Sequence, residues 1–127
     1  MNKKIIYYWS PFVDKVATVR SVINSALSLN KFSHGKYDSV ILNVSGEWSN
    51  YYSELKEKKI KIFDFNKKYF ILKKSKIGFL KSRLSYIWVF FTCFFPLLKL
   101  LKREKPDFLI IHLITVLPLF LFLLFKF

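Results

Sequence analysis

Residues capable of chemistry are few and scattered in this chain of 127 residues. His34 and His112 lie far apart in the sequence, and the only cysteine, Cys93, stands between them in an apolar run. This spacing predicts no metal-binding cluster, and a lone cysteine cannot form an internal disulfide. The sequence also lacks a nucleophile elbow, a Walker loop and a complete dinucleotide-binding fingerprint. We therefore expect no catalytic turnover from this chain alone.

A carboxylate and an indole stand side by side at Glu47 and Trp48, directly after an apolar run. Such a pair could hold a sugar, with the carboxylate accepting hydrogen bonds from hydroxyl groups and the ring stacking on the sugar face. The more ordinary interpretation is a capped turn in which Trp48 packs inward.

The formal net charge is +14, from 22 basic and 8 acidic residues. This imbalance predicts an anionic partner, which could be nucleic acid, an anionic membrane surface or a phosphorylated ligand. No recognition motif of a nucleic-acid-binding module is present, so we expect no nucleic-acid partner.

Positive charge is densest between residues 67 and 83, where basic residues are mixed with aromatic and aliphatic ones and no acidic residue interrupts them. The pattern suits a segment lying at a membrane surface, where each basic residue contributes about 1 kcal/mol on an anionic leaflet. A solvated loop between a strand and a helix is the alternative. The basic residues are Lys67, Lys68, Lys73, Lys74, Lys76, Lys81 and Arg83.

The elements that must position these residues follow an alternating order. Short apolar runs predict strands at 4–9, 39–44, 60–65 and 108–112, and helical spacing predicts helices at 16–29 and 50–58. Short connections between them favour right-handed crossovers in a parallel sheet. The predicted fold class is therefore α/β, a Rossmann-like parallel sheet with flanking helices, in a single domain over residues 1–127.

Two uncharged apolar runs, 84–98 and 108–125, raise the alternative of a small basic integral membrane protein with two apolar helices. A membrane-spanning helix needs about 20 apolar residues, and the first run is short for a span. The second run contains His112 and Pro118, which would lie at membrane depth. The preceding Lys105-Pro106-Asp107 favours an extended start, so we expect a strand over 108–112 and then an apolar helix over 114–125 kinked at Pro118.

Three strings resemble the N-terminal domain of GT-B glycosyltransferases, in the large retaining family that contains mannosyl- and glucosyltransferases of bacterial polysaccharide synthesis. They are KIIYYWSP at 4–11, the helical pattern at 19–29, and KPDFLIIH at 105–112. In that family a Lys/Arg-Pro-Asp start and a terminal His mark the fourth strand, and an apolar helix follows. The resemblance extends over essentially the whole chain, through motifs that are individually short.

The resemblance implies a part in nucleotide-sugar-dependent glycosyl transfer. Such enzymes have two Rossmann-like domains, of which the first binds the acceptor and the second the nucleotide sugar. The implied function is the acceptor-side domain of an enzyme of cell-surface polysaccharide or glycolipid synthesis, with a sugar or lipid-linked sugar as acceptor. No cofactor is implied, because the nucleotide sugar is the donor substrate of the full-length enzyme.

The family's donor-side carboxylate pair, phosphate-contacting basic residue and glycine-rich second half have no counterpart here. The chain therefore resembles an incomplete, truncated domain, inactive without the missing C-terminal donor domain. The implied location is cytoplasmic and peripheral, at the inner face of the plasma membrane.

The resemblance also assigns roles to single residues. His112 is the candidate catalytic residue, beside the reacting sugar, and a core histidine is the alternative. Asp14 and Lys15, in the loop after the first strand, join Glu47 and Trp48 as candidate acceptor-binding residues. The family often has a glycine-rich turn in that first loop, whereas this sequence has no glycine there, which argues against close approach of the backbone to a donor phosphate.

Overall fold

A computed structural model of the chain describes residues 3–11, 17–65 and 78–112, without the side chains of 78–90. One parallel sheet of four strands, in the order β3-β2-β1-β4, forms its centre. The strands are β1 (Lys4–Trp9), β2 (Tyr37–Asn43), β3 (Lys61–Asp64) and β4 (Phe108–Ile111). The helices are α1 (Ala17–Phe32), the 3₁₀ turn η1 (Ser49–Tyr51), α2 (Tyr52–Glu57) and α3 (Gly78–Glu104). The predicted α/β, Rossmann-like fold class is confirmed.

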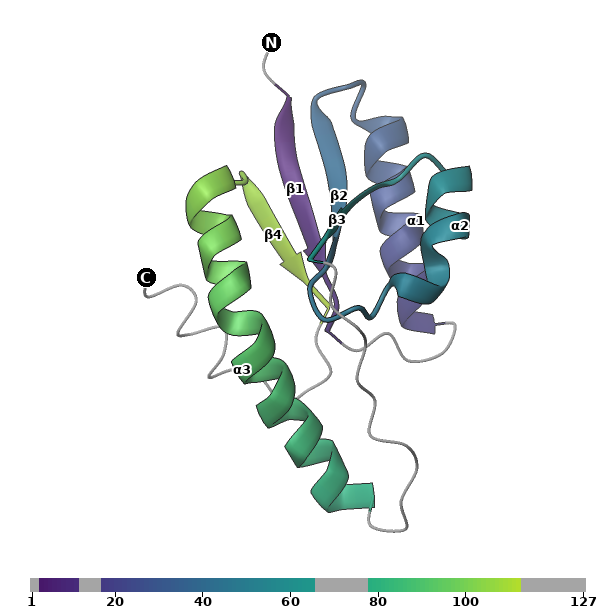
Figure 1. Ribbon diagram of the computed structural model, residues 1–127. Helices are drawn as coiled ribbons and strands as arrows, with labels where there is room; N and C mark the ends of the chain where they lie inside the picture. The colour runs from purple at the N-terminus through teal and green to yellow at the C-terminus, as the bar shows by residue number, and fades with distance from the viewer. Residues whose placement is uncertain (1–2, 12–16, 66–77, 113–127) are drawn as a thin grey trace.

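The two faces of the sheet are covered by different helices, with α1 and α2 on one side and α3 on the other (Figure 1). Successive side chains of a strand point to opposite faces, so the apolar run of β1 supplies both cores. Tyr7 and Trp9 pack in the α3 core, whereas Ile6 and Tyr8 pack in the α1 core. The run Ile6–Trp9 is consequently buried throughout.

Helix α1 forms where helical spacing predicted one and ends at Phe32, beyond the expected end at residue 29. Its buried residues, Val19, Val22, Ile23 and Ala26, recur every three or four positions and form one apolar stripe against the sheet. Gly35, at φ 78°, then turns the chain into β2.

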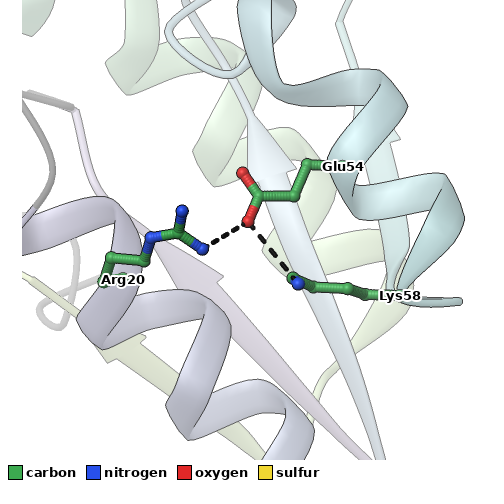
Figure 2. A network of polar contacts seen from close by, with 3 residues as sticks. All are labelled: Arg20, Glu54 and Lys58. Atoms are coloured by element: carbon green, nitrogen blue, oxygen red, sulfur yellow. Dashed lines mark hydrogen bonds and ion pairs between the residues drawn. The ribbon is translucent and has the colours of Figure 1, made fainter.

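Helix α2 is tied to α1 by the carboxylate of Glu54, which contacts Arg20 of α1 (Figure 2). Glu54 Oε1 lies 2.8 Å from Arg20 Nη1 and 3.7 Å from Lys58 Nζ. Beneath this network Leu55 is buried in the α1 core. Exposed ion pairs contribute roughly 0–1 kcal/mol, so burial of Leu55 is the larger part of what holds α2 in place.

Helix α3 joins two sequence regions of different character into one helix. It includes the uncharged run 84–98, with Pro96 inside, and continues through residues 99–104, which carry Lys99, Lys102 and Arg103. Cys93, Phe94, Leu97 and Leu100 are its buried contacts with the sheet. The amino-terminal half of α3 runs past the carboxyl ends of the strands (Figure 1). The apolar run therefore packs on a sheet, in the part of the helix whose side chains the structure describes.

Hydrogen bonds join strand β4 to β1 at both ends of β4. The Asp107 backbone N–H donates to Ile5 O over 3.0 Å, and Ile5 N–H donates back to Asp107 Oδ2 over 2.8 Å. At the far end, His112 N–H donates to Trp9 O over 3.0 Å. The expected strand at 108–112 is confirmed, although it ends at Ile111.

These pairings contradict a helix over the first residues of the run 108–125, because residues 108–111 are extended and hydrogen-bonded to β1. Among the helices that the structure describes, none combines the length and apolarity needed to cross a membrane. The expected helix at 114–125 lies outside the described residues.

Candidate functional site

The strand order contains one reversal, which lies between β1 and β4. From β1 the chain proceeds to β2 and β3 on one side, and β4 is then added on the other side of β1. In open parallel α/β sheets, ligands bind beyond the carboxyl ends of the strands at such a reversal. Here these ends are Trp9 and Ile111, which are direct partners, so the next residues at this edge are Ser10 and His112.

Several buried side-chain polar atoms have no hydrogen-bond partner among the described residues, and two of them belong to the residues that directly follow β1 and β4. Ser10 is 1% exposed, and its Oγ has no hydrogen-bond partner among the described residues. Nε2 of His112 is likewise buried and finds no partner within the same ranges. An unsatisfied buried polar atom costs about 1–3 kcal/mol, so these two atoms, in residues that directly follow paired strands, are candidate contacts for a ligand.

The chemistry of His112 is set by its surroundings. Its ring stacks on Tyr8, with centroids 6.2 Å apart and planes inclined by 22°. Burial lowers the pKa of His112 below its ordinary value of 6.5, so the imidazole is neutral at pH 7. A neutral imidazole can donate or accept one hydrogen bond at Nε2. The site is thus suited to a hydroxyl group more than to compensation of a negative charge.

Glu47 forms the turn that follows β2. Its Oε1 accepts a hydrogen bond from Val44 N–H over 3.1 Å, and its Oε2 accepts from Ser45 N–H and Ser45 Oγ over 2.7 and 2.8 Å. The side chain is buried, and burial raises the pKa of Glu47 above its ordinary value, while the donated hydrogen bonds oppose that shift. The carboxylate therefore organises the backbone of its own turn.

Trp48 completes the same turn. Its backbone N–H donates to Asn43 Oδ1 over 2.9 Å, and its ring meets Tyr51 edge-on at 5.8 Å. Trp48 is 0% exposed, so it offers no ring face on which a sugar could stack. Glu47 and Trp48 are thus both buried in a capped turn with Trp48 packed inward, which is the arrangement of the ordinary interpretation. Their acceptor-binding role stays a prediction.

A second polar cluster lies at the carboxyl ends of β2 and β3, and the sequence reasoning did not find it. Asn43 and Asp64 are paired in register, and Asn43 Nδ2 donates to Asp64 Oδ1 over 3.2 Å. The same amide donates to Tyr52 Oη over 2.6 Å, and the Tyr52 hydroxyl in turn donates to Asp64 Oδ2. A polar residue closing each strand was the available signal, but only pairing of the strands brings the residues together.

The remaining predicted site residues lie outside what the structure describes. This holds for Asp14 and Lys15 in the first loop and for the basic residues between 67 and 76. Lys81 and Arg83 belong to α3, and their side chains are not described. In the described ranges, no group of three or more His, Cys, Asp or Glu side chains could hold a metal ion.

Comparison with protein-family models, curated proteins and solved structures finds no match to this chain. Function must therefore be argued from the sheet edge itself.

Proposed function

We propose that this chain is the acceptor-side, Rossmann-like domain of a nucleotide-sugar-dependent glycosyltransferase of cell-surface polysaccharide or glycolipid synthesis. The acceptor sugar is placed at the carboxyl ends of β1 and β4. The observation that carries the proposal is the pair of buried, unsatisfied atoms, Ser10 Oγ and His112 Nε2, at the single reversal of the strand order.

A sugar suits this edge better than a charged ligand. The neutral imidazole of His112 can exchange a hydrogen bond with a hydroxyl, and Ser10 Oγ can both donate and accept. Asn43 at the end of the neighbouring strand β2, Asp64 at the end of β3, and Tyr52 form a hydrogen-bonded polar cluster at the same edge. Hydroxyl and neutral imidazole groups, which can both donate and accept, suit a polyhydroxyl compound.

The role proposed for His112 depends on the string that carried the resemblance. Asp107 of Lys105-Pro106-Asp107 fixes the start of β4 through Ile5, and His112 ends the strand through Trp9. Hydrogen bonds at both ends of this string therefore position His112 at the site. In the proposed reaction His112 hydrogen-bonds a sugar hydroxyl beside the reacting centre, and a second domain must bind the nucleotide sugar before any transfer takes place.

The experiment is a titration of the ¹⁵N-labelled chain, followed by two-dimensional NMR. The ligands are a panel of mono- and disaccharides and, separately, UDP-glucose and GDP-mannose. We expect millimolar binding of at least one saccharide, with amide shifts at Tyr8, Ser10 and His112 and loss of binding in His112→Ala. Asn24→Ala, on the exposed side of α1, is the matched control and retains binding.

Two results would reject the proposal. One is the absence of shifts at this edge with every saccharide at saturating concentration. The other is binding of the nucleotide sugars at this edge in preference to the free saccharides, since that would make it a donor site.

We also propose that the protein is peripheral on an anionic membrane surface, on the strength of its net charge of +14. The sequence places the contact at residues 67–83. High salt is expected to release the bound protein from membranes, because screening weakens attraction between charges. Resistance to both high salt and alkaline carbonate would contradict this location.

A further inference from the structure

The edge of the sheet opposite the candidate site carries exposed aromatic rings. Phe32, the last residue of α1, is 69% exposed, and Phe108, the first residue of β4, is 50% exposed. The Phe108 ring meets Tyr37 of β2 at 6.5 Å, across the start of β1. Exposed large apolar side chains that gather at one end of a domain mark an interaction surface more often than isolated ones do.

Exposed lysines lie at the same end of the sheet as these rings. Lys4, Lys31, Lys36 and Lys105 are all exposed, and none makes an ion pair with a carboxylate of the described residues. Lys31 Nζ lies 5.4 Å from the centroid of the Phe32 ring. The local carboxylates are engaged elsewhere: Asp38 with Lys61, Glu104 with Arg103, and Asp107 with the backbone of β1. Positive charge at this edge is therefore largely uncompensated.

The parallel topology brings these residues to one edge. The strands β1, β2 and β4 all begin at the upper end of the molecule, where α1 ends (Figure 1). Backbone hydrogen bonds join the segments there, from Lys4 N–H to Lys36 O over 2.9 Å and from Asp107 N–H to Ile5 O over 3.0 Å. The edge is thus a preformed surface assembled from three separate parts of the chain.

We propose that this amino-end rim docks on the surface of an anionic phospholipid bilayer. The rim consists of Lys4, Lys31, Phe32, Lys36, Lys105 and Phe108. Phenylalanine rings enter the interfacial region of a bilayer while lysines remain at the level of the headgroups, so both kinds of side chain are satisfied at once. A planar bilayer can contact every member of a rim that lies along one edge.

The composition of the rim favours lipid over nucleic acid. Its cations are lysines, which act as point charges, and its exposed rings are phenylalanines, whereas the planar guanidinium group of arginine is preferred for bidentate and stacking contacts with nucleic acid. Arg103, the arginine nearest this edge, is paired with Glu104 and lies over the Phe63 ring at 5.9 Å. Charge and exposed phenylalanine together therefore match an anionic lipid surface.

This inference rests on the proposed membrane association but assigns the contact to a different surface. Strand β1 has six residues, so at roughly 3.3 Å per residue the candidate sugar site stands about 20 Å from the rim. Docking by the rim turns that site away from the lipid. An acceptor would then be reached from the aqueous side, and the segment 67–83, which follows the carboxyl end of β3, would not be the principal contact.

The test is sedimentation of the full chain with vesicles of phosphatidylcholine containing 30% phosphatidylglycerol, with pure phosphatidylcholine vesicles for comparison. The rim variant K31Q/K36Q/K105Q is compared with K67Q/K68Q/K73Q, which removes the same charge from the basic segment. At roughly fivefold per lysine, the rim variant is expected to bind on the order of 100-fold more weakly, whereas the segment variant stays within a few-fold of the parent chain. Phe32→Ser is expected to weaken binding without any change of charge.

Circular dichroism establishes that each variant is folded, and each remaining outcome overturns the inference in a different way. If the segment variant alone loses binding, the membrane contact lies at 67–83 and the proposed location survives. An equal loss in both variants shows that only net charge matters. No binding to anionic vesicles removes the peripheral location altogether, while the sugar titration decides the acceptor-domain proposal separately. If a DNA oligonucleotide displaces the parent chain from vesicles, and binds the rim variant more weakly, the rim is a nucleic-acid surface.

Discussion

The turn after β2 offers the sharpest test of the structure, because one carboxylate there serves three donors. Replacing Glu47 by alanine removes the acceptor of Val44 N–H, Ser45 N–H and Ser45 Oγ. Val44 is 0% exposed and Ser45 9%, so water reaches these groups poorly. Each buried unsatisfied group costs about 1–3 kcal/mol, and the serine hydroxyl can rotate to another acceptor. Two backbone amides remain, and at that cost for each we expect Glu47→Ala to lose about 2–6 kcal/mol of unfolding free energy.

The measurement is urea unfolding followed by tryptophan fluorescence, for which Trp48 is an adjacent reporter. Glu47→Gln is the shape-matched control, because it keeps one acceptor oxygen but turns an NH₂ group toward donors. It is expected to lie between the parent chain and the alanine variant. A loss below about 0.5 kcal/mol for Glu47→Ala would refute the argument, since it would mean that the hydrogen bonds do not hold the turn.

The pH dependence of this variant pair tests the electrostatics. The pKa of Glu47 is raised in the folded protein from its ordinary value of 4.5, because burial penalises the charged form. For a raised pKa, the stability contribution is fully present below the unfolded value and is lost as the pH rises through the folded value. The stability of the parent chain relative to Glu47→Gln is therefore expected to fall as the pH rises above 4.5. A rise over that range would show that the donated hydrogen bonds outweigh burial.

Three other predictions concern the edge and the strand that bear the site. Proton NMR should show His112 titrating below its ordinary pKa of 6.5, and a pKa above 6.5 would contradict its burial. A lowered histidine pKa contributes stability that is lost as the pH falls through the folded pKa. His112→Phe should therefore remove the pH dependence of the unfolding free energy between pH 6.5 and the folded pKa. Ser10→Ala should raise the unfolding free energy by up to about 1–3 kcal/mol, because it removes a buried hydroxyl that has no partner in the described structure. A loss of stability in urea unfolding would reveal a partner. Asp107→Ala should lower the unfolding free energy by about 1–2 kcal/mol and speed amide hydrogen exchange in β4, because Ile5 N–H loses its carboxylate acceptor. Unchanged exchange at Leu109 and Ile111 would contradict the role of Asp107 in holding β4 against β1.

Local sequence signals were reliable where burial on both faces or a fixed backbone preference left little choice. The apolar run 4–9 became β1 at the expected bounds, because a β-branched and aromatic run that is buried on both faces has few other conformations available. Lys105-Pro106-Asp107 predicted the start of β4, since the residue before proline is disfavoured in the helical region. Helix α3 was harder to predict from the sequence, because its apolar run, which contains Pro96, and its basic end have different compositions. Packing against the sheet is what makes them one helix.

The candidate site divides in the same way. The sequence by itself determined that His112 would lie at the carboxyl end of a strand and that Glu47 and Trp48 would follow one, because strand ends are set by local composition. Tertiary structure decided that β4 lies beside β1, which brings Ser10 next to His112, and that β3 lies beside β2, which joins Asp64 to Asn43. It also decided that Trp48 is core and Phe32 is surface, although both are large apolar residues beside a turn. The physical reason is that strand order and burial depend on contacts between segments distant in sequence, which local periodicity does not encode.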